Sequence, residues 1–306
     1  MSTVLILLST YNGGKFLRYQ LDSLVKQKGV ELQILIRDDG SADDTIDIVN
    51  KYKSTHSNIT LIEGNNCGVP KSFFELAYYA FNHLSKYDYY AFCDQDDVWE
   101  PEKLESAVSK LDNYYENKLY FCRAKYVDEN LKLIKESPII KQFDYTTCVY
   151  RNPVLGCTMV FDHKLLEYFC MAFPEADRIH SLHDAWLFKC AVYTDAFIVS
   201  DDKSYIKYRQ HGNNVTNAYK SPLKKYLTAI KRRLGRKSFY RLSAQYFLEV
   251  YENYIADDEK RIFIEAMVKY NTSFKSTLRF LNIQKWRTES TIDKFFWRLL
   301  VLFRLF

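Results

Sequence analysis

The sequence predicts an α/β fold in which a mostly parallel sheet is flanked by helices and followed by a helical, basic C-terminal extension. Three observations predict it. Short apolar runs alternate with segments of helical periodicity, polar and glycine-rich turns separate them, and strand signals stop after Asn217. Strands that alternate with helices are typical of parallel sheets covered by helices on both faces.

The first predicted unit is a strand, a glycine turn and a helix. Val4 to Leu8 form an unbroken apolar run, the turn Ser-Thr-Tyr-Asn-Gly-Gly follows, and apolar residues from Phe16 to Val25 recur at helical spacing. The apolar run lacks the basic segment and cleavage site of a signal peptide and is too short to cross a membrane. We therefore expect a core strand.

The same unit recurs along the following sequence. Each repeat combines an apolar run, a polar turn and a helical pattern with a capping or helix-opening residue. In order, the expected elements are a strand at Leu32–Ile36, a helix from Ile46 to Tyr52 capped by Asp43 or Asp44, a strand at Ile59–Ile62, a helix from Pro70 to about His83, and a strand at Tyr89–Cys93.

The later part of the chain mixes helix and strand signals less regularly. The expected elements are a helix from Pro101 to about Tyr115, a helix at His183–Tyr193, and strands near Tyr120–Ala124, Cys157–Phe161, Phe197–Val199 and Tyr205–Tyr208. Long amphipathic, basic and aromatic stretches follow Asn217, so we place a boundary near Ser221-Pro222.

Charge and cysteine usage narrow the class of protein. The seven cysteines are scattered without a C-x-x-C pair, which argues against a disulfide framework or a thiolate zinc site and favours the cytoplasm. The net charge is +5, but 12 basic and no acidic residues lie between Lys203 and Leu248, and the remainder carries −7. The basic section is therefore expected to meet an anionic surface or ligand.

Polar residues follow the predicted strands at their carboxyl ends, where such sheets bind ligands. Thr10-Tyr11-Asn12 follow the first strand, and Asp94-Gln95-Asp96-Asp97 follow the fourth. Three aspartates within four residues repel each other unless a cation neutralises them, and carboxylate oxygens suit Mg²⁺ or Mn²⁺. The alternative is a solvated acidic turn that caps the next helix, which explains Asp97 better than Asp94.

Three further sites carry candidate chemistry. One carboxylate of Asp38-Asp39 could accept hydrogen bonds from a base or ribose while the other caps a helix, although the pair is also a common turn. Asp184 opens a helix, where it would stay ionised and accept a proton from a sugar hydroxyl, or would simply cap the helix. Arg209 could offset a diphosphate, and His211 could bind a metal or the diphosphate.

Several motifs together resemble the family 2 glycosyltransferases of the GT-A fold. They are VLILLSTYNGGKFLRYQLDSL, IRDDGSADDT, NNCGVPKSF, FCDQDDVW, LGCTMVF, HDAW and YRQHGNNV, and they span residues 3 to 217. The combination of DQDDVW, HDAW and YRQH is similar to bacterial rhamnosyltransferases that build cell-wall, capsular or O-antigen polysaccharides.

The resemblance implies a Rossmann-like catalytic domain over residues 1–220, with a nucleotide-sugar half to about residue 100, and a separate C-terminal region over 221–306. It implies Asp184 as the general base of an inverting reaction, and Mn²⁺ or Mg²⁺ bound by Asp96, Asp94 and His211. The implied donor-binding residues are Thr10, Tyr11, Asn12, Asp38, Asp39, Asp94, Gln95 and Arg209. Many members carry Pro at the position of Thr10 and Glu at that of His183, so the roles of these two residues stay open.

The expected function is transfer of rhamnose from dTDP-rhamnose to a lipid-linked glycan, with a UDP-hexose as the alternative donor. A nucleotidyltransferase would normally show a glycine-rich, basic loop, which Tyr11-Asn12-Gly13-Gly14-Lys15 resembles only loosely. A catalytically silent scaffold is the third possibility, and the joint presence of Asp94, Asp96 and Asp184 argues against it.

The C-terminal region suggests where the protein works. Segments 221–241 and 293–306 combine basic and apolar residues as interfacial helices do, so we expect peripheral contact with the inner face of the plasma membrane. The alternative is a helical pair that packs on the catalytic domain or on a second subunit of a homo-oligomer. The basic stretch is accompanied by no recognised nucleic-acid motif.

Overall fold

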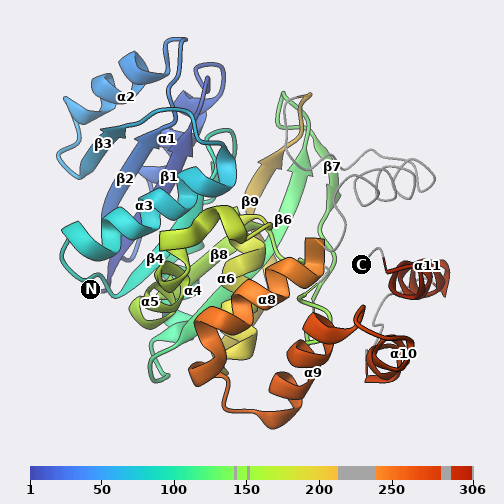
Figure 1. Ribbon diagram of the computed structural model, residues 1–306. Coiled ribbons are helices and arrows are strands. Elements are labelled where there is room, and N and C mark those ends of the chain that lie inside the picture. The colour runs from blue at the N-terminus through green and yellow to red at the C-terminus, as the bar shows by residue number, and fades with distance from the viewer. Residues whose placement is uncertain (141–142, 150–151, 213–238, 284–290, 305–306) are drawn as a thin grey trace.

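The computed structural model describes residues 1–140, 143–149, 152–212, 239–283 and 291–304. Its centre is a nine-stranded mixed sheet with the strand order β3-β2-β1-β4-β8-β6-β9-β5, and β7 pairs with β6. Helices cover both faces of this sheet (Figure 1). The predicted α/β class is confirmed.

The first half of the chain forms the predicted strand and helix units. Its elements are β1 (Thr3–Thr10), α1 (Leu17–Leu24), β2 (Glu31–Asp38), α2 (Thr45–Lys53), β3 (Ile59–Glu63), α3 (Val69–His83) and β4 (Tyr89–Cys93). The four strands are parallel, with β1 between β2 and β4. Their carboxyl ends therefore meet at one edge of the sheet.

The apolar run of β1 is unbroken because both faces of the strand are covered. Val4, Ile6 and Leu8 belong to one buried cluster with residues of α1, α2 and α4 (Lys103–Leu111), whereas Leu5 and Leu7 belong to a second cluster with α3. Successive side chains of a strand point to opposite faces, so a strand between two helical layers is apolar at every position.

The second half of the chain makes the sheet mixed. Its elements are β5 (Val98–Trp99), α4, β6 (Lys118–Val127), β7 (Leu133–Glu136), β8 (Met159–Asp162), α5 (His163–Met171), α6 (His183–Tyr193) and β9 (Phe197–Arg209). Strand β8 is antiparallel to both of its neighbours, β4 and β6, so the run of four parallel strands ends there, while β6 and β9 beyond it are parallel to each other.

Strand β9 differs from the sequence prediction, which placed two short strands in its range. It is one strand of 13 residues, and its pairing with β6 shifts register on either side of Arg123. These irregularities let the polar residues around Asp202 and Lys203 leave the ladder while the strand continues. Strand β7 was not predicted because all four of its residues are exposed, so it has no apolar run.

The C-terminal helices pack against the sheet-bearing part of the chain. They are α8 (Phe239–Tyr251), α9 (Asp258–Lys269), α10 (Phe274–Ile283) and α11 (Thr291–Leu302), and short 3-10 helices lie at Gly156–Thr158, Phe173–Arg178 and Glu252–Tyr254. Helix α8 lies on α6, where Phe247 packs against Trp186 (Figure 1). Within the described ranges, no helix is long and apolar enough to cross a membrane.

The predicted boundary and basic segment fall mostly outside the described residues. Ser221-Pro222 lie there, as does the segment 221–241 except for its last three residues, which begin α8.

Candidate active site

A cleft of about 620 Å³ lies at the carboxyl edge of the parallel strands. It is lined by most of the residues that the sequence predicted for the site: Tyr11, Asn12, Asp39, Asp94, Gln95, Asp96, Asp184 and His211. The structure thus brings together the residues that follow β1, β2 and β4, the start of α6 and the end of β9. Thr10, Asp38 and Arg209 lie beneath this surface instead.

The loop after β1 is tied to the loops after β2 and β4. The backbone NH of Tyr11 donates to Oε1 of Gln95 at 2.8 Å, and the Gln95 amide donates back to the Tyr11 carbonyl at 3.0 Å. Asn12 has a φ of 46°, a left-handed conformation that asparagine tolerates, and its Oδ1 accepts from the NH of Ala42. These bonds hold one wall of the cleft in shape.

Asp38 organises the turn after β2 from below. It accepts hydrogen bonds from the Thr10 hydroxyl at 3.0 Å, from the NH of Gly40 at 3.1 Å and from the NH of Ser41 at 2.8 Å. Thr10 and Asp38 are each 1% exposed. The expected contact of Thr10 with a base or ribose is therefore corrected, because its hydroxyl is buried and engaged by Asp38.

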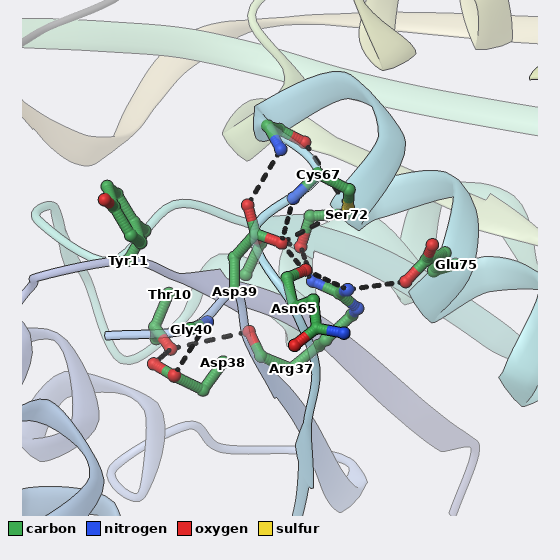
Figure 2. Close-up of polar contacts among 12 residues, drawn as sticks. Thr10, Tyr11, Arg37, Asp38, Asp39, Gly40, Asn65, Cys67, Ser72 and Glu75 are labelled. Carbon is green, nitrogen blue, oxygen red and sulfur yellow. Dashed lines mark hydrogen bonds and ion pairs between the residues drawn. The ribbon is translucent and has the colours of Figure 1, made fainter. Parts of the chain in front are cut away.

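Asp39, directly after β2, is held by an arginine of that strand (Figure 2). Arg37 Nη1 donates to Asp39 Oδ1 at 2.6 Å, while Arg37 Nη2 lies 2.6 Å from a carboxylate oxygen of Glu75. The backbone NH groups of Cys67 and Gly68 each donate to Asp39 at 2.9 Å. Burial alone would raise the pKa of Asp39, but these hydrogen bonds outweigh it and lower the pKa below its usual value. Asp39 therefore faces the cleft as an oriented carboxylate.

The acidic run after β4 divides into residues with different environments. Burial, followed by the nearby charges of Asp96 and Asp184, raises the pKa of Asp94 to about 7. Asp96 Oδ2 lies 2.7 Å from His211 Nε2. Such a concentration of negative charge at the cleft favours the presence of a cation.

Arg209 supports this run from beneath the cleft. Its Nε donates to the backbone carbonyl of Asp96 at 2.8 Å, its Nη1 donates to the carbonyl of Glu129, and its guanidinium lies 4.5 Å from the centre of the Phe16 ring. Arg209 is 1% exposed. The buried guanidinium therefore positions backbone and does not line the cleft, so direct contact with a diphosphate is not supported. The expected offset of diphosphate charge stays a prediction.

The sequence suggested that Asp97 caps the next helix. In the structure Asp97 is fully buried and does not cap it. The N-cap of α4 is Glu102, whereas Asp97 Oδ1 accepts from the backbone NH of Arg209 at 3.0 Å. Burial, then the charges of Asp96 and Asp94, raise the pKa of Asp97 well above its usual value. Asp97 therefore joins the acidic run to the end of β9.

The cleft contains an aspartate-rich group of possible metal ligands. In the described part of the chain, one group of three residues could hold a metal ion: Asp94, Asp97 and Cys157. One possible ligand atom from each residue lies within 4.8 Å of the other two. Mn²⁺ and Mg²⁺ prefer oxygen ligands, so the Cys157 thiol is a poor ligand for either ion. Asp94, Asp96 and His211 line the cleft together, and carboxylate oxygens are the ligands that Mn²⁺ and Mg²⁺ prefer. Among the described residues, however, the ligand atoms of these three do not form a group as close as that one.

Asp184 stands in the first turn of α6. Its Oδ1 accepts from the NH of Ala185 at 2.6 Å and its Oδ2 from the NH of Gly156 at 3.2 Å, while the N-cap position belongs to Leu182. Burial raises the pKa of Asp184 to about 6. The carboxylate is therefore mostly ionised at neutral pH, and it is a stronger base than an ordinary aspartate.

His183 is the neighbour whose role the sequence left open. It is 6% exposed, its ring stacks on Phe73 with a centroid distance of 3.8 Å, and burial lowers its pKa to about 3. Neither ring nitrogen has a hydrogen-bond partner among the residues that the structure describes. His183 is thus a neutral aromatic wall next to Asp184.

Two charged residues of the cleft had no role assigned to them from the sequence. Lys15 follows the glycine turn, and Glu129 lies in the turn between β6 and β7. Glu129 belongs to none of the motifs and lies more than a hundred residues from Lys15, so only the fold brings the two together.

The sequence model of glycosyl transferase family 2 matches residues 5–163, which cover β1 to β8 and the acidic run. The chain belongs to this family. Among individual proteins, the dTDP-rhamnosyl transferase RfbG of Shigella flexneri is similar: it is 32% identical over 246 residues, which are 76% of this chain and 81% of that protein. The protein is therefore a glycosyltransferase.

Solved structures agree with the family 2 fold. The crystal structure of S. aureus TarS in complex with UDP has a TM-score of 0.55 at 20% identity, over 92% of this chain and 78% of that one. The mannosyltransferase PcManGT of Pyrobaculum calidifontis, in complex with GDP-Man and Mn²⁺, has a TM-score of 0.53 at 14% identity, over 99% and 86%. At these identities the comparisons establish the shared fold.

Proposed function

We propose that the protein is an inverting glycosyltransferase that transfers rhamnose from dTDP-rhamnose to a lipid-linked bacterial surface polysaccharide. The observation that carries the reaction is the position of Asp184, a buried carboxylate with a raised pKa in the same cleft as the Asp94 and Asp96 carboxylates. The relationship to RfbG, whose name gives dTDP-rhamnosyl transfer, supports the donor.

Asp184 acts as the general base. Its two oxygens accept backbone hydrogen bonds from Ala185 and Gly156, so the carboxylate is fixed against the start of α6. It takes the proton of an acceptor hydroxyl as that oxygen attacks the anomeric carbon, opposite the departing nucleoside diphosphate. The configuration inverts in a single displacement, which requires no covalent enzyme intermediate.

The acidic run and His211 hold the donor's charged end. Asp94, Asp96 and His211 would bind Mn²⁺ or Mg²⁺, which when bound offsets the charge that develops on the diphosphate leaving group. The contact between His211 Nε2 and Asp96 Oδ2 and the bond from Arg209 to the Asp96 carbonyl orient this part of the site.

The nucleoside lies, in this proposal, against the loops after β1 and β2. Tyr11 is 46% exposed and offers a face for stacking, while Asp39 offers an oriented carboxylate to the NH of a pyrimidine or to ribose hydroxyls. Asn12 and Gln95 line the same wall. Uracil and thymine both fit this description, so a UDP-hexose is the alternative donor, and the UDP complex of TarS favours including it.

A donor panel tests the class and the sugar together. With Mn²⁺ or Mg²⁺, dTDP-rhamnose should be turned over in preference to UDP-glucose, UDP-galactose and UDP-GlcNAc, and EDTA should stop the release of nucleoside diphosphate. Turnover that persists in EDTA would refute the metal assignment. Preference for a UDP-sugar would replace the donor but keep the class.

Replacement of the base separates binding from chemistry. Asp184→Asn should keep the affinity for dTDP or UDP, measured by calorimetry, and should lower turnover by at least about 10²-fold, the usual contribution of a general base. Unchanged turnover would remove Asp184 from this role.

The lipid-linked acceptor is supported by the composition of the C-terminal helices. Phe295 in α11 is 64% exposed, and Phe303, which follows the end of this helix, is 71% exposed. Three basic residues of the same segment are also exposed, namely Lys294, Arg298 and Arg304. Exposed aromatic and basic side chains together suit the interface of an anionic membrane. We assign peripheral membrane contact to this surface and to the basic segment 221–241.

A further inference from the structure

An ion pair spans the cleft at its exposed rim. Lys15 Nζ, in the loop after β1, lies 2.5 Å from Glu129 Oε2, in the turn between β6 and β7, and both residues line the cleft. Their side chains are 66% and 47% exposed. The pair therefore connects the loop after β1 with the turn between β6 and β7, at two residues that both line the cleft.

The cleft carries an excess of negative charge. Five carboxylates line it, those of Asp39, Asp94, Asp96, Glu129 and Asp184. In the ranges that the structure describes, Lys15 is the only lysine or arginine that lines the cleft. The guanidinium of Arg37 is engaged by Asp39 and Glu75, and that of Arg209 is buried beneath Asp96. A diphosphate that enters this cleft adds further negative charge.

We propose that Lys15 is a ligand of the donor's diphosphate, and that Glu129 holds its ammonium group at the cleft until a donor binds. On binding, Lys15 exchanges the Glu129 carboxylate for diphosphate oxygens, so no covalent bond is made or broken. This inference rests on the proposed function, because it requires a nucleotide-diphosphate donor.

The physical properties of the pair suit such an exchange. An exposed ion pair contributes little stability, whereas a diphosphate offers a lysine more negative charge than a single carboxylate does. A lysine ammonium is also a compact charge on a flexible stem, which lets it move between partners. The hydrogen bond from Lys15 lowers the pKa of Glu129, so the carboxylate stays ionised and competes with the diphosphate for Lys15 at neutral pH.

The backbone of Glu129 has a structural role that is separate from the ion pair of its side chain. Its backbone carbonyl accepts the hydrogen bond from Arg209 Nη1. Glu129→Gln therefore removes the competing charge and leaves the support of Arg209 in place, which makes it a clean variant for a test.

The test measures affinities of the full-length protein by calorimetry with Mn²⁺. Lys15→Ala should weaken the binding of dTDP and UDP by about tenfold, as expected for a lost charge-assisted contact, and should change the binding of dTMP and UMP much less. Glu129→Gln should strengthen the binding of the diphosphates because it frees Lys15. In the double variant this gain should disappear, since Lys15 carries it.

Lys28 provides a matched control. Its Nζ lies 3.2 Å from Glu102, the two side chains are 63% and 51% exposed, and Lys28 precedes β2, at the edge of the sheet opposite to the cleft. Lys28→Ala should leave all four affinities unchanged.

The outcomes separate the two proposals. If Lys15→Ala binds diphosphates as the wild type does, or if Lys15→Ala and Glu129→Gln weaken binding equally, the pair is only a structural clasp and the inference is overturned. If the wild type binds neither dTDP nor UDP, the proposed function fails and this inference falls with it.

Discussion

At the scale of single residues, the pKa values of Asp39 and Asp184 are shifted in opposite directions. Asp39 is buried among donors, and its pKa is lowered by the hydrogen bonds from Arg37 and from two backbone NH groups. Asp184 is buried with fewer donors, and its pKa is raised to about 6 by the loss of water. The first carboxylate is therefore suited to bind, and the second to accept a proton.

The pKa of Asp184 predicts the acid limb of the pH profile. The base must be ionised to accept a proton, so activity is full above the raised pKa and falls as the pH drops through it. With metal and acceptor saturating, kcat/KM should fall about tenfold between pH 7 and pH 5, with a midpoint near 6. A midpoint near the value of an exposed aspartate would contradict the buried environment.

Arg37 holds Asp39, which the proposed function places against the nucleoside. Arg37→Met should lower the free energy of unfolding by about 3–5 kcal/mol, because it leaves the buried carboxylate of Asp39 without its cation. Binding of dTDP and UDP should weaken at the same time, since Asp39 loses its orientation and its low pKa.

Urea unfolding and calorimetry measure the two effects, and Lys28→Met is the control. The exposed pair of Lys28 and Glu102 should be worth about 0–1 kcal/mol. Similar losses in both variants would mean that the environment of Arg37 is not the buried one described here.

At the scale of elements, the position of Asp184 depends on how α6 is held. Helix α6 is buried almost throughout, and α8 covers it from the outer side (Figure 1). Phe247 of α8 is fully buried and contacts the rings of Trp186 and Tyr193 with centroid distances of 5.3 and 5.2 Å. The C-terminal helices thus support the helix that carries Asp184, the proposed base.

Truncation of Phe247 tests this support. Phe247→Ala should lower the free energy of unfolding by about 3–5 kcal/mol because it leaves a cavity between α6 and α8. Turnover should fall more than the affinity for dTDP or UDP, since Asp184 is on α6 and the nucleoside wall is not. Leu242, also on α8 but 39% exposed, is the control, and Leu242→Ala should change stability by less than about 0.5 kcal/mol.

At the scale of the whole molecule, the C-terminal helices combine packing with an exposed apolar and basic surface. Leu300 and Val301 of α11 are 4% and 0% exposed and belong to the main buried cluster, whereas Phe295 and Phe303 face solvent. The two interpretations of this region, core packing and membrane contact, therefore concern different side chains and can be tested separately.

Two sets of substitutions distinguish membrane contact from core packing. The variant with Phe295→Ser and Phe303→Ser should bind less to anionic lipid vesicles in a flotation assay and should unfold at the same temperature as the wild type, because it removes only exposed apolar groups. Val301→Ala should lower the unfolding temperature and keep vesicle binding. Vesicle binding that is unchanged in the double serine variant would contradict membrane contact through α11.

The local sequence was sufficient to predict the first half of the sheet. Apolar runs and turns predicted β1 to β4 and the helices between them, and the edge at which their polar loops meet follows from parallel topology alone. Long-range packing decided which of the candidate residues are buried and which line the cleft. It buried Thr10 and Arg209, which had looked like ligands, and it brought Glu129 to Lys15 across the cleft. Burial and ion pairing depend on residues far apart in the chain, so the pKa of Asp184 and the charge balance of the cleft emerge only once the sheet is assembled.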